Sequence, residues 1–151
     1  MFLERKEDLA IYYWLVDIFS STPGINIVDG FPDDPLEPPT ISVEWDDTEV
    51  VDFQLGDRSG KRLRTWFIDV FAKNKTTRDE FAYKIHNELR NGITVYDVVN
   101  GVPTQDKIGH LDILQRRIKV VRVDPELVST LYYRASISIL AENTILQDDE
   151  V

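Results

Sequence analysis

Few residues in the sequence have types and spacings that could form a catalytic or metal-binding site. Cysteine is absent, which excludes disulfides, thiolate metal ligands and cysteine nucleophiles. The only two histidines, His86 and His110, match no zinc-binding spacing. We interpret both as packing or surface residues and expect neither a metal site nor a cofactor.

Acidic residues are abundant, so a small metal-dependent nuclease has to be weighed. Such a site needs carboxylates that converge on a divalent cation, usually with a lysine nearby. The two candidate sets are Asp69 with Lys73, and Asp52 and Asp57 with Lys61. A strand acid bonded to a neighbour explains the first set, and a solvated loop explains the second. With no nucleophile-elbow or phosphate-loop motif in the chain, we predict that the protein is not an enzyme and keep the nuclease as the alternative.

The composition favours one soluble domain over residues 1–151. The chain is 42% hydrophobic and 29% charged, which suits a folded domain with a buried core. Its net charge is −10, so its field as a whole repels phosphate. This charge serves solubility, or it forms a surface past which DNA slides. The apolar run at 9–19 is too short to cross a bilayer and contains Asp17, so we expect an intracellular protein.

Apolar residues at helical spacing predict a first helix over residues 7–21. Trp14 and Ile18 lie on the side opposite its first apolar stripe, so the helix is apolar nearly all round. Such a helix has to be covered on more than one face. Either the centre of its own domain or a partner subunit covers it, and on the second reading Trp14 and Ile18 lie in a subunit interface.

The middle of the chain predicts strands followed by a helix. The proline-rich stretch 31–40 predicts an extended connector, and 41–47 a strand that forms a hairpin with 49–55 through a turn at 46–48. Residues 63–72 alternate with large apolar groups on both faces, which predicts a central strand covered on each side. A second helix follows, with Thr77 and Glu80 as a capping box and Gly92 as the residue that ends it.

The last third predicts further strands. We expect strands at 93–99, 108–115, 118–123 and 131–142, a loop over 100–110, a turn at 124–129 and an acidic tail at 146–151. The alternation at 131–141 is the cleanest in the chain. The order of elements predicts an α+β fold, with two helices packed on a mainly antiparallel sheet centred on 63–72 and 131–141.

Several stretches between Ile41 and Ala141 resemble the neck and tail-terminator proteins of tailed bacteriophages. The quoted pieces are "PPTISVEW", "FQLGDRSGKRLRTWFIDVFAKNKTTRDEFAYKI", "ITVYDVVNGVP", "KIGHLDI" and "LYYRASISI". The resemblance implies a tail-terminator-like fold and a hexameric ring that ends the tail tube and joins it to the head connector. It implies a virion protein of the neck or tail, assembled in the host cytoplasm. Its implied partners are further copies of the chain, the tail tube protein, the sheath of a contractile tail and other neck proteins, while genomic DNA passes without specific binding.

The segment 44–62 is acidic in its first part and basic at its end. We predict a hairpin arm that projects from the sheet, because a compact domain has little need of so long a polar excursion. The acids expected to face solvent or the DNA channel are Asp46, Asp47, Glu49 and Asp52. The basic residues expected to contact a neighbouring subunit are Arg58, Lys61 and Arg62. An exposed hairpin without a partner and an adaptor that forms no ring are the alternatives.

Overall fold

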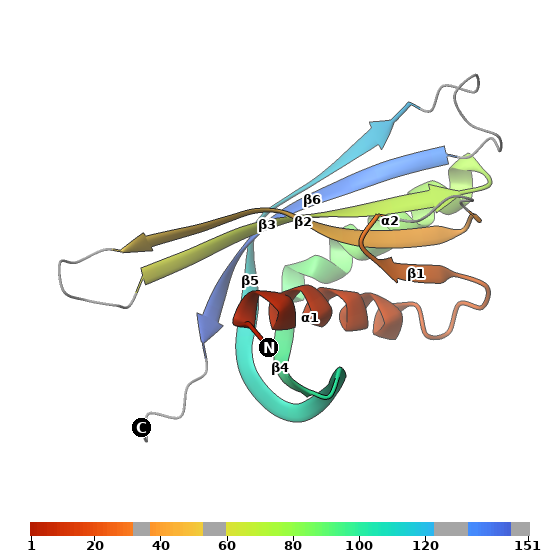
Figure 1. Cartoon of the computed structure of the whole chain (residues 1–151). Helices are drawn as coiled ribbons and strands as arrows, with labels where there is room; N and C mark the ends of the chain where they lie inside the picture. The colour runs from red at the N-terminus through yellow and green to blue at the C-terminus, as the bar shows by residue number, and fades with distance from the viewer. Residues whose placement is uncertain (32–36, 53–59, 123–132, 146–151) are drawn as a thin grey trace.

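The computed structural model describes residues 1–31, 37–52, 60–122 and 133–145, with the backbone alone at 50–52, 60 and 61. Two α-helices and a short 3-10 helix accompany the sheet within these residues (Figure 1). The helices are α1 (Leu3–Ile18), α2 (Lys75–Glu88) and the 3-10 helix η1 (Leu89–Asn91). The strands are β1 (Asn26–Asp29), β2 (Thr40–Asp52), β3 (Gly60–Ala72), β4 (Ile93–Val99), β5 (Val102–Val121) and β6 (Tyr133–Ile145).

The described strands form one sheet in the order β1-β2-β3-β6-β5-β4. β1 pairs in parallel with β2, and every other neighbouring pair is antiparallel. The predicted α+β fold with a mainly antiparallel sheet is therefore confirmed. The two strands expected at its centre, β3 and β6, are its two middle strands, while residues 131 and 132 lie outside the described part.

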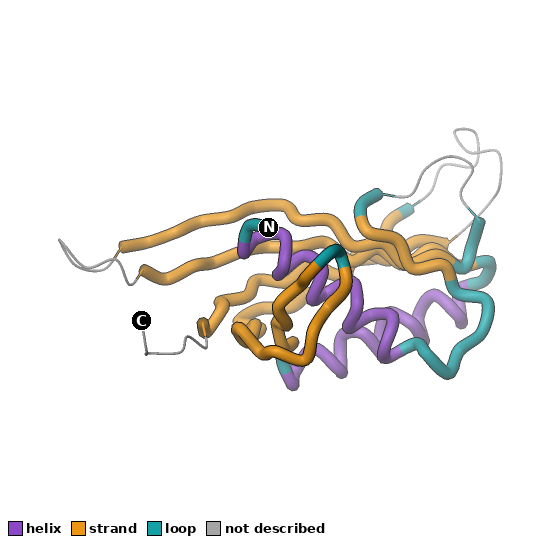
Figure 2. Tube along the Cα trace, turned by 60° about the horizontal axis from the view of Figure 1, so that its bottom comes forward, coloured by secondary structure: helices purple, strands orange, loops and turns teal. Residues whose placement is uncertain are grey.

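Both helices cover the same face of the sheet (Figure 2). Ile11 and Leu15 of α1, together with Ile85 of α2, enter one apolar cluster with Trp66 and Ile68 of β3. All five side chains are fully buried, and the burial of each of the four aliphatic ones stabilises the fold by about 1.5–3 kcal/mol. The alternation predicted for β3 is thus confirmed on this face.

We had predicted that the opposite face of β3 is covered too, and this is wrong for part of the strand. Phe67 on that face is 38% exposed, whereas Phe71 further along is buried. The ring of Phe71 packs at 6.0 Å from that of Phe31, and the guanidinium of Arg134 lies 5.3 Å from its centre. Local contacts cover one end of this face, and no helix of the described part lies over it.

The helix boundaries differ from the prediction. α1 begins at Leu3 and ends at Ile18, earlier than the predicted 7–21. α2 is capped by Asn74, whose side-chain oxygen accepts a hydrogen bond of 2.8 Å from the backbone N–H of Thr77. Thr77 is therefore the residue that is capped and the predicted capping box is wrong. Gly92, predicted to end the helix, follows η1 and has a positive φ of 71°.

Two strands are longer than the sequence pattern indicated. The predicted hairpin between 41–47 and 49–55 is wrong, because β2 continues through a bulge between Trp45 and Asp47 and pairs with β3. Likewise, the single strand β5 contains most of the predicted loop at 100–110 and of the predicted strands at 108–115 and 118–123. It carries a bulge between Ile113 and Gln115. The predicted turn at 124–129 lies outside the described residues.

A tight turn joins β4 to β5. Asn100 and Gly101 both have positive φ, at 55° and 76°. This Asn-Gly pair provides the backbone twist that two-residue hairpins require. The local signal for this hairpin was therefore present in the sequence, although the segment was assigned to a loop.

The sheet forks at one end. The pairing of β3 with β6 ends at Leu63 and Glu142, whereas its pairing with β2 continues to Asp52 and Gly60. Beyond the fork, β6 stays paired with β5 as far as Ile145. Figure 1 shows the β2–β3 hairpin extending away from the rest of the sheet at this end.

Candidate functional site

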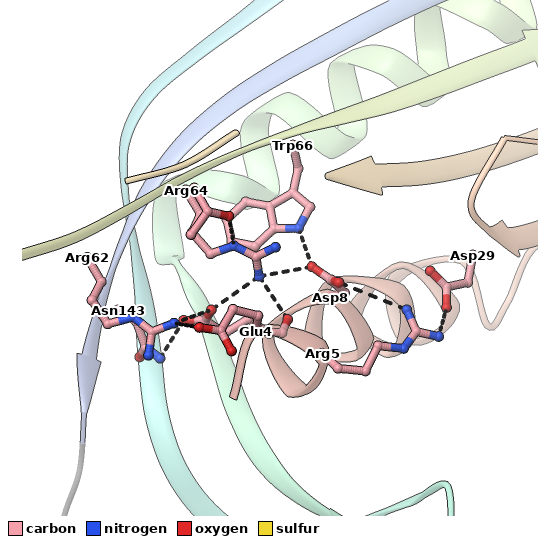
Figure 3. Close-up of polar contacts among 10 residues, drawn as sticks. Glu4, Arg5, Asp8, Asp29, Arg62, Arg64, Trp66 and Asn143 are labelled. Carbon is pink, nitrogen blue, oxygen red and sulfur yellow. Dashed lines mark hydrogen bonds and ion pairs between the residues drawn. The ribbon is translucent and has the colours of Figure 1, made fainter. Parts of the chain in front are cut away.

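Charged side chains of α1 and β3 meet at the fork between β3 and β6 (Figure 3). Helical spacing places Glu4, Glu7 and Asp8 on the side of α1 that faces the sheet. Strand alternation places Arg62, Arg64 and Trp66 on one face of β3. We call the following residues the buried charge cluster: Glu4, Glu7, Asp8, Arg62, Arg64, Trp66 and, from β6, Asn143.

Arg64 lies at the centre of the buried charge cluster. Its Nη1 is 3.2 Å from Glu7 Oε1 and 3.0 Å from Asp8 Oδ1, and it donates a bond of 2.8 Å to the backbone oxygen of Glu4. Its Nε donates to Thr48 Oγ1 at 2.8 Å. The guanidinium also lies 4.7 Å from the ring centre of Trp66, within the range of a cation–π contact.

Further hydrogen bonds of the cluster connect the helix to both strands of the fork, while Arg62 Nε and Asn143 Oδ1 have no partner within the described residues. Trp66 Nε1 donates to Asp8 Oδ1 at 2.9 Å. Asn143 Nδ2 donates to the second oxygen of Glu7 at 2.7 Å. Arg62 Nη2 donates to Glu4 Oε1 at 2.8 Å and lies 3.7 Å from Glu7 Oε1. Glu7 thus bridges β3 and β6 where the two strands separate.

This arrangement of charges holds structural elements in fixed positions. Glu7 is 1% exposed and Arg64 is 3% exposed, so their charges are almost entirely out of water. Removing two charges from water costs nearly as much as their attraction returns, so such a pair adds little net stability while fixing its partners in one geometry. The cluster therefore determines where α1 sits on the sheet. Its carboxylates are all occupied by hydrogen-bond donors.

The sequence did not reveal this cluster. Arg62 was expected in a subunit interface, and the basic group around it was interpreted as a complement to acidic partner surfaces. In the structure Arg62 bonds to Glu4, and Arg64 bonds to Glu7 and Asp8, all in the same chain. Strand alternation was the available signal. Arg62 and Arg64 lie four and two residues before the core residue Trp66, so their side chains lie on the same face of β3 and need buried partners.

Of the two interface residues predicted on α1, one lies beside a cavity. A cavity of about 460 Å³ separates α1 from the β4–β5 hairpin. Trp14 lines it together with Tyr13 and Tyr96, while Ile18 packs at the edge of the core. Val16 is 40% exposed. The interface role of Trp14 and Ile18 stays a prediction.

The predicted acids of the arm lie on β2. Asp46, Asp47 and Glu49 are exposed in the structure. Asp46 accepts a weak hydrogen bond of 3.4 Å from Thr65, and Asp47 accepts one of 2.8 Å from the backbone N–H of Thr48. The side chains of Asp52 and Lys61, and the whole of Arg58, lie outside the described residues.

Other titratable side chains are paired within the fold. Asp69, the strand acid weighed as a metal ligand, forms an ion pair of 3.3 Å with Arg134 Nη2, although its buried Oδ1 accepts no hydrogen bond within the described residues. A hydrogen bond of 2.6 Å from Lys6 lowers the pKa of Asp97. Burial and the nearby charge of Arg116 lower the pKa of His86. Among the described residues, no three His, Cys, Asp or Glu side chains gather as metal ligands would.

No protein-family model matches the chain, and no curated protein matches it. Within the described residues, no helix has the length and apolar character needed to span a membrane.

Proposed function

We propose that the chain is a structural subunit of the neck of a tailed bacteriophage, where copies form a ring that ends the tail tube and joins it to the head connector. The observation that supports this function best is the forked sheet, in which the buried charge cluster fixes α1 at the fork and the β2–β3 hairpin extends beyond it. The polar groups of the cluster hold elements in place. A rigid subunit with a projecting hairpin is what a ring between two larger assemblies requires.

The charge of the protein supports the same function. DNA that moves through a ring must not adhere to its wall, and a wall of negative potential repels phosphate. The net charge is −10, and Asp46 projects as an exposed carboxylate from the hairpin strand β2. Further copies, the tail tube protein and other neck proteins are then the partners. Genomic DNA passes through without specific binding.

Native mass spectrometry of the purified full chain tests this function. We expect a closed ring, with six copies as the stoichiometry that the resemblance implies. Labelled protein in assembled particles should be found between head and tail by electron microscopy. A stable monomer that cleaves DNA in the presence of magnesium would favour the nuclease instead, and a stable monomer found in one-to-one complexes would favour the adaptor.

A charge introduced on α1 tests whether the helix takes part in the ring. Trp14→Asp should shift the mass distribution towards monomer while the circular dichroism spectrum stays unchanged, because Trp14 lines an open cavity. Tyr83→Asp is a matched control, since Tyr83 is 58% exposed on α2, and it should still form rings. If Trp14→Asp unfolds the chain, the helix belongs wholly to its own core.

A further inference from the structure

Two long strand edges are unpaired within the described part of the chain. β1 pairs with β2 only from Thr40 to Val43, so β2 is unpaired on that side from Glu44 onwards. β4 pairs with β5 no further than Leu111, so β5 is unpaired on that side from Asp112 to Val121, apart from a hydrogen bond between His86 and the backbone of Arg116. Such edges present backbone N–H and C=O groups that pair readily with another strand.

The two edges face in opposite directions. β3 and β6 lie between β2 and β5 in the sheet, as Figure 1 shows. Each neighbouring pair from β2 to β5 is antiparallel, so β2 and β5 run in opposite directions. A second copy placed beside the first with the same orientation therefore brings its β2 against β5 in antiparallel pairing. The helices of both copies then stay on one side of the joined sheet.

The side chains at the two edges carry opposite charges. Cross-strand pairing places Glu44, Phe67, Ser138 and Arg117 in one row across the face that the helices leave open. At the β2 end, the exposed residues on this face include Glu44, Asp47 and Glu49, and at the β5 end they include Arg117 and Lys119. Asp112, further along β5, is bonded to Thr144. Opposite charges across an interface select the register and the partner.

Exposed apolar side chains accompany the charges. Trp45 on β2 is 51% exposed and Val120 on β5 is 53% exposed. Trp45 pairs with Trp66 and Val120 with Ala135, so both belong to the face that the helices cover. In a joined sheet they lie on the same side of the new strand pair. Contact between copies would remove both from water.

From these features we propose that the β2 edge of one copy pairs with the β5 edge of the next, so that successive copies build one continuous antiparallel sheet. The partner is a second copy of this chain. The contact is head-to-tail, because different surfaces of the two copies meet, and a constant rotation between copies closes such a contact into a ring. The inference rests on the proposed ring function and specifies one pair of surfaces that meet in the ring.

Two charge-reversed variants test this contact. The first variant, Arg117→Glu with Lys119→Glu, has two acidic edges, and the second, Asp47→Lys with Glu49→Lys, has two basic edges. We expect each variant alone to lose the ring and remain monomeric. An equimolar mixture should form rings of alternating variants, because every contact then joins an acidic edge to a basic one. Native mass spectrometry distinguishes the two variants by mass.

A control variant separates edge pairing from net charge. Lys73→Glu with Lys75→Glu changes the net charge as much as the first variant does, at exposed positions outside both edges. It should form rings as the parent chain does. Amide hydrogen exchange adds a direct readout, since exchange at 44–49 and 112–121 should be slower in the ring than in the monomeric variants.

The outcomes are distinct for the two proposals. If the parent chain forms rings and the two variants form them equally well alone, the edge contact is wrong and the ring function stands. The edge contact is also wrong if the amides of 44–49 and 112–121 exchange as fast in the ring as in a monomer. A parent chain that stays monomeric at all concentrations overturns both proposals.

Discussion

The guanidinium of Arg64 and the carboxylate of Glu7 form an ion pair of 3.2 Å that is almost entirely buried between α1 and β3. Glu7 also accepts a hydrogen bond from Asn143, so one helical residue holds both strands of the fork. A pair of this kind depends on each partner being present. The loss of one charge leaves the other in a low-dielectric site without compensation.

We therefore expect Arg64→Met to destabilise the fold by about 3–5 kcal/mol, because Glu7 and Asp8 lose their central cation. The free energy of unfolding in urea, measured at fixed protein concentration, checks this value. The double variant Glu7→Gln with Arg64→Met should be less destabilised than the sum of the two single variants. Lys73→Met, at an exposed position, should change stability by no more than about 0.5 kcal/mol. Additive effects of Glu7 and Arg64 would contradict the coupling.

The cap of α2 gives a second prediction. Asn74→Ala should lower the free energy of unfolding by ~1 kcal/mol, since the side-chain acceptor of the Thr77 N–H is lost. Thr77→Ala is the matched variant, because it keeps the backbone N–H and the Asn74 acceptor. It should have a clearly smaller effect. A larger loss for Thr77→Ala would restore the capping box predicted from the sequence.

Two glycines with similar φ values should respond differently to substitution. Gly101→Ala should cost roughly 1–2 kcal/mol from its positive φ alone, because a Cβ there meets nothing within 4 Å. At Gly92 a Cβ would lie 2.3 Å from His110 Nε2 and 2.7 Å from the backbone oxygen of Leu111. Gly92→Ala should therefore be the more destabilising of the two in thermal unfolding. Equal losses would show that the packing against β5 relaxes easily.

His86 should make stability depend on pH. Its pKa in the folded state is lowered from the ordinary value of 6.5 by burial and by Arg116, so the unfolded chain binds more protons in the window just below that pH. The free energy of unfolding should consequently decrease as the pH falls from 7.5 through 6.5 towards the lowered pKa. His86→Gln should reduce this decrease, as measured by urea unfolding at several pH values.

Asp97→Asn provides the control for that measurement. Lys6 lowers the pKa of Asp97 from its ordinary value of 3.8, so its contribution is present above pH 3.8 and is lost only at lower pH. This variant should shift stability by the same amount at pH 5.5 and 7.5 and keep the slope of the parent chain. If the decrease of the free energy of unfolding with falling pH persists in His86→Gln and disappears in Asp97→Asn, then Asp97 and not His86 causes it.

Local sequence patterns determined the class of fold and the middle of the sheet. Alternation with period two in β3 and β6 identified the two central strands and the face that carries Trp66, Ile68 and Ile137 into the core. These assignments succeeded because the side chains of a strand alternate between its faces wherever one face is buried. The same alternation places Arg64 on the face of Trp66, although we did not predict its burial and the pattern contains nothing about its partner.

The tertiary structure alone decided which distant residues meet. The bulges near Asp46 and Leu114 interrupt the alternation, so each long strand resembled two short ones in the sequence. Arg64 and Glu7 are 57 positions apart. Their pairing depends on how α1 crosses the fork, and the unpaired edges of β2 and β5 depend on where β1 and β4 stop. Local patterns contain none of these relations, because each one is fixed by packing between segments that are remote in the chain.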